Sequence, residues 1–503
     1  MFIITSTSLM KSWMKWKNSK IGLFIILGLI FLSHLPFINA DPDRNMSVGR
    51  GPFTDEGLNT IQIRNWVNHG DLNLKDCDNL LKTPLLGFPL ALTYKIFGVN
   101  HVVSRLHVLV LLFMALLLFG LDEKHRRIII IFSLITLLQY EVFQSSHYSM
   151  AEMLSVAAVL LSIHFLTRSF DTGLSQKLQN RQAILSAVFL SLSYFIKIQF
   201  IYLIVLLPVV LAIQWFTTNY LVRRLVVRQG FVITSTLLFF LLLYLLAWYL
   251  PNKEIYDYMM AHQSGEFTFS GKIREYIRFN LEYYFLKGWF QWFVYILLAL
   301  MVTGFVMLKR SKSRRYPLLF FSSLVWFLLE LHKLTLVYLP TRYQIGLFVA
   351  MGLLMSVVSN ELLAWPAART RTLVRVMTIA VLFTLTAING YHYIDTFHHR
   401  SFVIRDTNKY LAAGLQPGDV VLGAWAPSLT WVSGSKALPV WNNFLNYQNP
   451  LNKYHPRVVI AETDEQDSEQ AWSSQGIILQ DLADSVKTVK IGQWEVIIYW
   501  MHK

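Results

Sequence analysis

The sequence predicts an all-α bundle that crosses a membrane many times, followed by a small α/β domain. Of its 503 residues, 54% are hydrophobic and only 15% are charged, whereas soluble domains are nearer a quarter charged. Several apolar runs reach about 18 residues, which is enough to cross a hydrocarbon core about 30 Å thick. These runs are continuous and do not alternate with polar residues, which excludes a β-barrel.

The net charge of +15 fits a membrane protein better than a nucleic-acid-binding one. Lys and Arg are retained in the cytoplasmic loops of membrane proteins, and no basic face with interleaved aromatic residues stands outside those loops. We therefore expect a lipid bilayer as partner and no nucleic acid. The single cysteine, Cys77, excludes an intramolecular disulfide and gives no metal-site spacing.

Basic residues alternate with the apolar runs and predict the topology. The first run, residues 21–38, follows four lysines and reads as a retained signal anchor, with the N-terminus in the cytoplasm. Every later loop on the predicted inner side is basic, which gives about eleven spans and an outer C-terminus. The further spans are expected at 102–120, 128–143, 152–167, 183–196, 199–216, 231–250, 288–308, 317–331, 343–359 and 376–394.

The chain divides into a membrane domain, residues 1–394, and an extracytoplasmic domain, residues 395–503. The membrane domain includes an outer loop at 41–83 and a short apolar piece at 84–97, which suits a re-entrant or interfacial helix. The second domain is polar, and its short apolar runs predict strands. These runs lie at 420–422, 458–460 and 494–499, the last after a turn at 491–493.

The outer loop carries an acidic pair, Asp55 and Glu56, directly after Thr54. Thr54 is a good N-cap for a helix that runs to about His69, so the pair could simply complement the helix dipole. A carboxylate held at the membrane surface could instead accept a proton from an acceptor hydroxyl, which is general-base catalysis.

Basic residues on the predicted outer side are candidates for binding a phosphate. The positive-inside rule accounts for Lys and Arg in cytoplasmic loops but not for these outer ones. Lys82 enters the apolar piece, either as a snorkelling lysine or as a phosphate ligand. Lys197 lies between two apolar runs. Lys333, Tyr338 and Arg342 follow in a later outer segment, where Arg suits bidentate phosphate contact and Tyr could belong to an aromatic belt.

A second outer turn, residues 145–152, ends in Glu152 at the mouth of a span. Ionisable residues at such depth are costly unless they have a partner or a role. His147 in this turn is more often an interfacial histidine than a ligand. Together with Glu56 and Glu152 it could hold a divalent cation, and no other cofactor is indicated.

In this order the motifs resemble those of the GT-C glycosyltransferases, nearest to the lipid A aminoarabinose transferases and protein O-mannosyltransferases. The resemblance covers roughly residues 20–360. It rests on the Asp-Glu pair, the Lys-x-Pro-Leu piece at Lys82, the Ser-Arg-Leu run at 104–106, the Phe-Ile-Lys turn at Lys197 and the His-Lys-Leu motif at 332–334.

Departures from the family pattern identify a divergent bacterial member. Thr83 replaces the first proline of the family's Lys-Pro-Pro motif. Ile198 and Gln199 replace the last two residues of its Lys-Gly-Pro motif, and Glu152 stands where the family usually has Asp.

The resemblance implies a glycosyltransferase of the bacterial inner membrane. It would move a sugar from a polyprenyl-phosphate donor to a hydroxyl of a glycan, lipid or protein on the outer face, with inversion at the anomeric carbon. Asp55 would be the base, and Glu56 and Glu152 would position the acceptor, the sugar or a divalent cation. The departing phosphate would be stabilised by positive charge. The residues implied in phosphate binding are Lys82, Lys197, Lys333, Tyr338 and Arg342.

Two other functions fit a polytopic chain. A transporter or flippase predicts ionisable residues near mid-span and broken helices in paired halves, whereas the candidate charges here lie at outer loop ends and no internal duplication is visible. A non-catalytic scaffold or sensor that uses the C-terminal domain predicts that Asp55 and Lys82 can be replaced without loss.

Overall fold

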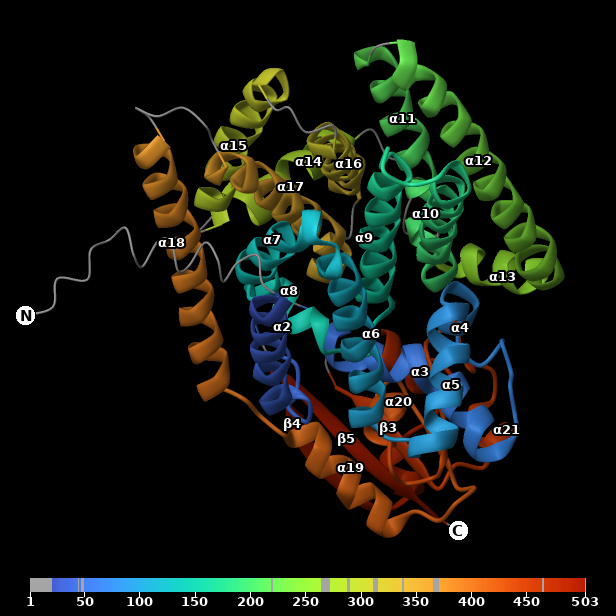
Figure 1. Cartoon of the computed structure of the whole chain (residues 1–503). Helices are drawn as coiled ribbons and strands as arrows, with labels where there is room; N and C mark the ends of the chain where they lie inside the picture. Colours follow the sequence, from blue (N-terminus) through green and yellow to red (C-terminus); the bar gives the residue numbers. More distant parts are fainter. Residues whose placement is uncertain are drawn as a thin grey trace, which may run out of the picture.

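A bundle of long helices stands on a small C-terminal sheet in the computed structural model (Figure 1). The structure describes residues 20–43, 45–46, 49–218, 220–263, 272–286, 290–310, 315–336, 339–364, 371–463 and 466–502. We call the end of the bundle that meets the sheet the sheet end, and the opposite end the far end. The fold class is the one that the sequence predicts.

Eight helices in the described residues are long and apolar enough to span a membrane, and nine if one bent pair counts as a span. This count covers the described residues, whereas the sequence predicts about eleven spans over the whole chain. The predicted span 128–143 falls on the bent pair, in which the segments Glu123–Leu137 and Tyr140–Ser146 are bent by 97° relative to each other. The predicted span 183–196 lies in a helix that begins with a polar segment, and the predicted span 288–308 corresponds to the apolar helix Phe290–Arg310.

The central helices of the bundle are α9 (Ala151–Ser169) and α17 (Ile345–Leu363), which are buried on nearly all sides. A helix that is hydrophobic all round belongs in a core or in lipid, and these two pack against other helices. The remaining bundle elements are α2 (Lys20–His34), α6 (His101–Leu121), α7 (Glu123–Phe132), η2 (Ser133–Leu137), α8 (Tyr140–Ser146), α10 (Gln176–Ile196), η3 (Ile198–Val205), α11 (Leu206–Thr217), α12 (Tyr220–Tyr244), η4 (Leu245–Tyr249), α15 (Phe290–Arg310), α16 (Arg315–Glu330), η8 (Leu331–Thr335), η9 (Thr341–Gln344) and α18 (Arg371–His398).

The loop after α2 forms a helix at the sheet end, α3 (Gly51–His69), which carries the acidic pair. Pro52 lies in its first turn, where a fixed φ favours helix initiation, so the helix begins before Thr54. The prediction that Thr54 caps this helix was wrong. The predicted end at about His69 is confirmed, because Gly70 follows with φ 73° and terminates the helix.

Four shorter helices are α4 (Asn79–Lys82), α5 (Pro84–Phe97), α13 (Lys253–Gln263) and α14 (Ile273–Leu281). The first two pack against α3, and α14 packs against η8. The predicted apolar piece at 84–97 has the bounds of α5, and Gly98 ends it at φ 82°.

The C-terminal domain is a five-stranded sheet of order β2-β1-β3-β5-β4. The β2, β1 and β3 strands are parallel, and β5 runs antiparallel to both β3 and β4. The three predicted strands are confirmed as β1, β3 and β5. The domain comprises α19 (Val403–Gly414), β1 (Val420–Leu422), α20 (Ala426–Leu429), β2 (Lys436–Leu438), α21 (Pro450–Tyr454), β3 (Val458–Glu462), α22 (Gln466–Ser473), η10 (Leu479–Leu482), β4 (Ala483–Ile491) and β5 (Trp494–Met501).

The acidic-pair helix α3 is packed directly onto this domain. Phe53 and Ile61 belong to the same buried hydrophobic cluster as residues of the sheet, and the ring centroids of Phe53 and Trp494 are 5.0 Å apart. Asn65 Nδ2 donates to the carbonyl of Ala437 at 2.9 Å. The position of α3 therefore depends on the C-terminal domain as well as on the bundle.

Candidate active site

A cavity of about 780 Å³ lies at the sheet end of the bundle. Its wall is mainly apolar and aromatic, yet it includes four of the residues singled out in the sequence, which come from four separate segments of the chain. The lining residues are Leu81, Lys82, Glu152, Lys197, Ile198, Gln199, Phe200, Ile201, Tyr244, Leu245, Tyr249, Tyr256, Met259, His332, Lys333, Leu336 and Tyr343.

Helix ends bring these charged groups together. Lys82 is the last residue of α4, Glu152 lies in the first turn of α9, Lys197 is the C-cap of α10, and Lys333 lies in η8, which continues α16. Successive membrane helices reverse direction, so residues at every second loop reach the same end of a bundle. The four charged residues are far apart in the sequence but lie at the same level of the bundle.

Each lysine of the cavity wall contacts a carboxylate. Lys197 Nζ donates to Glu152, and Lys82 Nζ donates to Asp78. An ammonium group carries three N–H donors, so the single bond to Glu152 leaves Lys197 with the capacity to contact a further anion.

Lys333 is held in the same way by Glu330, whose Oε2 lies 2.6 Å from Nζ. Its ammonium also donates to the carbonyl of Tyr343 at 2.7 Å. Glu330 is fully buried and accepts from Tyr202 Oη at 2.6 Å and from Trp326 Nε1 at 2.9 Å. These bonds fix Lys333 against the cavity wall. Glu330 was not predicted as a site residue, although a carboxylate at the end of an apolar run is a signal that could have found it.

Asp55 lies beside this wall and forms an ion pair with Arg342, with 2.8 Å between Oδ2 and Nε. Arg342 directly precedes Tyr343, which lines the cavity. The guanidinium fits over the first turn of α3 because residue 51 is glycine. A Cβ on Gly51 would collide with Arg342 Nη1.

Burial raises the pKa of Asp55 above the usual aspartate range, the charge of Arg342 lowers it, and the charge of Glu152 raises it again. A carboxyl group with a raised pKa binds a proton more strongly than an ordinary aspartate, which suits a general base. The charge of Glu152 raises the pKa of Asp55 and the charge of Lys197 lowers it, so the charged groups of the cavity lie close enough to act on Asp55.

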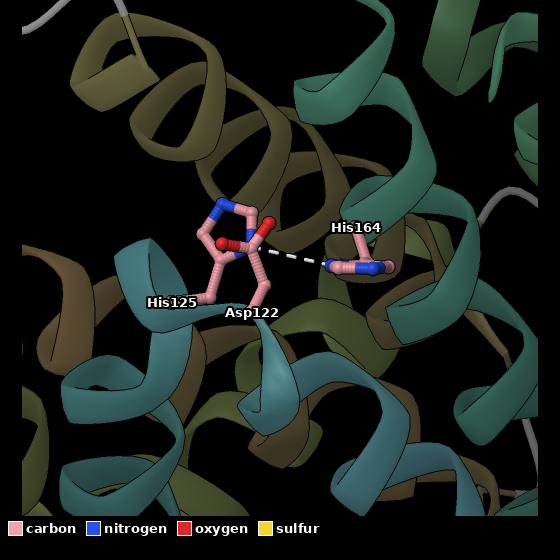
Figure 2. Close-up of side chains that lie close together, drawn as sticks. All are labelled: Asp122, His125 and His164. Atoms are coloured by element: carbon pink, nitrogen blue, oxygen red, sulfur yellow. Dashed lines mark hydrogen bonds and ion pairs between the residues drawn. The ribbon is translucent and has the colours of Figure 1, made fainter. Parts of the chain in front are cut away.

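His147 lies away from these charges. Its Nδ1 is 3.1 Å from Nδ1 of His34, and both rings are buried. In the described part of the chain, the three side chains that come close enough to share a metal ion are Asp122, His125 and His164, which lie elsewhere (Figure 2). A divalent cation held by Glu56, His147 and Glu152 stays a prediction.

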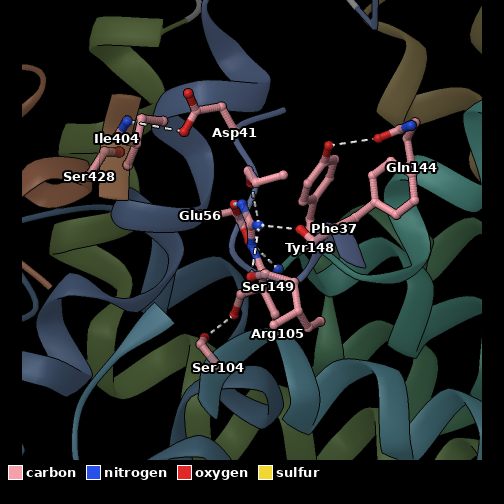
Figure 3. Close-up of polar contacts among 12 residues, drawn as sticks. Phe37, Asp41, Glu56, Ser104, Arg105, Gln144, Tyr148, Ser149, Ile404 and Ser428 are labelled. Carbon is pink, nitrogen blue, oxygen red and sulfur yellow. Dashed lines mark hydrogen bonds and ion pairs between the residues drawn. The ribbon is translucent and has the colours of Figure 1, made fainter. Parts of the chain in front are cut away.

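Glu56 faces away from Asp55 and accepts two bonds from Arg105, from Nε at 3.0 Å and from Nη2 at 2.5 Å (Figure 3). The backbone N–H of Ser149 adds a third bond at 2.7 Å. Arg105 also donates to the carbonyls of Phe37, Ile38 and Ala40. Glu56 therefore joins α3 to α6 and to the turn before α9.

The remaining predicted residue, Tyr338, lies outside the described residues. The structural role of Arg105 was missed in the sequence, although the residue stands in the Ser-Arg-Leu run that carries part of the resemblance. Arg50 was also missed. Its Nη1 lies 2.9 Å from Glu462 Oε2 at the junction of α3 with the sheet.

The helical bundle, the cavity at its sheet end and the C-terminal sheet domain define a polytopic membrane protein with the GT-C fold. No protein-family profile matches this chain, and no curated protein matches its sequence. One solved structure that shares the fold is ArnT from Cupriavidus metallidurans bound to undecaprenyl phosphate. It is 12% identical, with a TM-score of 0.58 over 94% of this chain and 96% of that one. ArnT in the apo state is 14% identical, with a TM-score of 0.58 over 95% and 97% of the two chains. At these identities the likeness shows the fold alone.

Proposed function

We propose that the chain is an integral-membrane glycosyltransferase that moves a sugar from a polyprenyl-phosphate donor to a hydroxyl of an acceptor. The observation that carries this proposal is the composition of the cavity, where Lys82, Lys197 and Lys333 lie in an otherwise largely apolar wall. An apolar wall suits a polyprenyl chain, and ammonium groups suit its phosphate. The fold shared with ArnT, which was solved with undecaprenyl phosphate bound, supports the same ligand class.

The proposed reaction uses Asp55 as the general base. Asp55 accepts the proton of the acceptor hydroxyl while the hydroxyl oxygen forms a bond to the anomeric carbon of the sugar. The bond from that carbon to the phosphate oxygen breaks, and its electron pair leaves with polyprenyl phosphate. Attack from the face opposite the phosphate inverts the anomeric centre.

Charge builds up on the phosphate as this bond breaks, and positive groups placed there beforehand lower the barrier. Lys82, Lys197 and Lys333 are the proposed donors to that phosphate. Glu152 and Glu330 act as positioning residues, because each holds one of these lysines through an ion pair.

Arg342 connects the base to the phosphate site. It balances the charge of Asp55 through their ion pair, so the carboxylate can stay ionised in a buried place until the acceptor arrives. Glu56 acts at a distance from the reacting atoms, by fixing α3 through Arg105.

The proposed reaction takes place on the extracytoplasmic side of the bacterial inner membrane, with the N-terminus in the cytoplasm. This orientation is supported by the distribution of basic residues. Glu152 lies in the first turn of α9 at the sheet end, whereas Arg168 lies in the last turn of the same helix. Arg126 and Lys124 lie at the far end as well, in the first turns of α7.

The test uses purified full-length protein in detergent micelles, supplied with polyprenyl-phosphate sugars and an extract of cell-envelope glycans and lipids as acceptors. Sugar transfer predicts that free polyprenyl phosphate is released only when acceptor is present. A transporter or flippase would bind the donor and leave its sugar–phosphate bond intact, so donor binding without release would contradict the proposal.

A further inference from the structure

Three side chains at the far end of the bundle, Asp122, His125 and His164, point toward one another (Figure 2). Asp122 is the N-cap of α7, His125 lies in the first turn of that helix, and His164 lies near the end of α9. One ligand atom from each lies within 4.8 Å of the other two. We propose that these residues bind a divalent transition-metal ion, for which Zn²⁺ is the best fit.

Two of the three distances between ligand atoms are close to those around a tetrahedral metal. Nδ1 of His125 lies 3.2 Å from Nδ1 of His164, and 3.5 Å from Oδ2 of Asp122. Zinc ligands at 2.0–2.1 Å and tetrahedral angles are about 3.3 Å apart. An ion between the three atoms therefore requires little movement of the side chains.

The hydrogen bonds around His125 place a lone pair on its Nδ1. The hydroxyl of Thr167 donates its proton to the carbonyl of His164 at 2.7 Å, so it must accept at its 3.1 Å contact with His125 Nε2. Nε2 therefore carries the proton of the neutral ring, and Nδ1 carries the lone pair. Metal-binding histidines characteristically donate the other ring N–H to such a partner.

Asp122 offers one oxygen in a similar way. Its Oδ1 accepts the backbone N–H of Lys124 at 3.0 Å as the helix cap, and its Oδ2 faces His125. Arg168 Nε lies 4.0 Å from that same oxygen, so a bound metal would share the carboxylate with Arg168. Both imidazoles are buried, with exposures of 0% for His125 and 2% for His164, which shields the site from competing water.

The donor set determines the class of ion. Two imidazoles and one carboxylate suit Zn²⁺ and neighbouring transition metals, whereas Mg²⁺ and Ca²⁺ prefer oxygen ligands throughout. Three protein ligands leave a fourth position for water or another donor. Because the ligands come from the α6–α7 turn and from the end of α9, the ion would tie these segments together. The site lies at the opposite end of α9 from Glu152 and does not rest on the proposed transferase function.

The test measures metal content of the untagged, full-length protein. The protein is stripped with a chelator, equilibrated with Zn²⁺ and freed of unbound metal by gel filtration, and zinc is then quantified by mass spectrometry. We expect one zinc ion per chain in the wild type and background levels in His164→Gln and Asp122→Asn. The matched control is His399→Gln, which should keep the zinc, since His399 pairs with Asp395 at 3.3 Å and belongs to no group of three metal-binding side chains among the described residues.

A second variant guards against loss of zinc through misfolding. His164→Cys replaces an imidazole by a thiolate that also binds zinc, so it should restore metal content, and Co²⁺ in this variant should give thiolate charge-transfer absorption. The proposal is overturned if the wild type holds no zinc above background, or if His164→Gln holds as much as the wild type. Loss of zinc in His147→Gln alone would also overturn it, by placing the metal near Glu56 and Glu152.

Discussion

Oδ2 of Asp55 lies 2.8 Å from Nε of Arg342, and this ion pair joins the first helix after α2 to the segment that leads into α17. The two residues are 287 positions apart in the chain. Their pairing places a partly buried carboxylate beside a cavity that also presents three lysines. The predictions below separate the chemical roles of these groups from their structural roles.

The first prediction concerns the pH dependence of turnover. Asp55 must be ionised to act as a base, so kcat/KM should fall as the pH drops through its pKa, which burial raises above the usual aspartate range. Arg342→Gln removes a charge that lowers this pKa, so its acid limb should move to higher pH. Glu152→Gln removes a charge that raises the pKa, so its acid limb should move to lower pH. Acid limbs that stay at the wild-type position in both variants would exclude Asp55 as the titrating base.

The second prediction concerns Lys197 and its partner Glu152. Lys197→Met leaves the buried Glu152 carboxylate without this ion pair, which costs about 3–5 kcal/mol of stability. The double variant Lys197→Met/Glu152→Gln removes both charges and should recover most of that loss. Turnover should stay low in both variants, because both lack the proposed hydrogen bond from Lys197 to the phosphate. A charged hydrogen bond of this kind contributes about 1.5–3 kcal/mol, or roughly 10- to 150-fold in kcat/KM.

Thermal unfolding and polyprenyl phosphate release measure the two effects separately. Wild-type turnover in the double variant would show that Lys197 has only a structural role.

The third prediction assigns Glu56 to stability. Glu56→Gln leaves Arg105 buried with an uncompensated charge, although three backbone carbonyls still accept from it. We expect a destabilisation of about 3–5 kcal/mol and a turnover per folded molecule close to the wild type. Arg105→Met combined with Glu56→Gln should restore part of the stability. A stable Glu56→Gln protein without turnover would instead place Glu56 in the chemistry.

The fourth prediction concerns the junction of α3 with the C-terminal sheet. Phe53 packs against Trp494 in a buried cluster shared by both parts. Phe53→Ala should cost about 3–5 kcal/mol, because it leaves a cavity in a packed core, and turnover should fall because α3 also positions Asp55. Phe53→Leu keeps most of the volume and serves as the control. Equal turnover and equal unfolding temperatures in the two variants would show that the sheet does not support the site.

Much of this arrangement could be predicted from the sequence. The alternation of basic loops with apolar runs places residues of every second loop at one end of the bundle, which is why Lys82, Glu152, Lys197 and Lys333 were expected together and do line one cavity. The short helix α5 and three strands were also predicted, since their apolar runs end at Gly or turn residues.

Other features depend on contacts that no local pattern reveals. The bonds of Arg105 join segments that are far apart in the chain, and a single sequence does not encode such a pairing. Thr54 has the side chain of a good N-cap, but Pro52 starts the helix earlier. The β4 strand was missed because it is largely polar and exposed, and α10 fell short of a full apolar span because it begins with a polar segment.

The most direct measurement is the rate of acceptor-dependent polyprenyl phosphate release by Asp55→Asn. Asn keeps the shape of the side chain but accepts no proton, so this rate should fall by 10²-fold or more, while donor binding and thermal stability stay near the wild type. Asp71→Asn is the matched control, since Asp71 lies in the same predicted loop and contacts Lys436 at the surface. Its rate should be that of the wild type. Release by Asp55→Asn at the wild-type rate would contradict the role of Asp55 as the base.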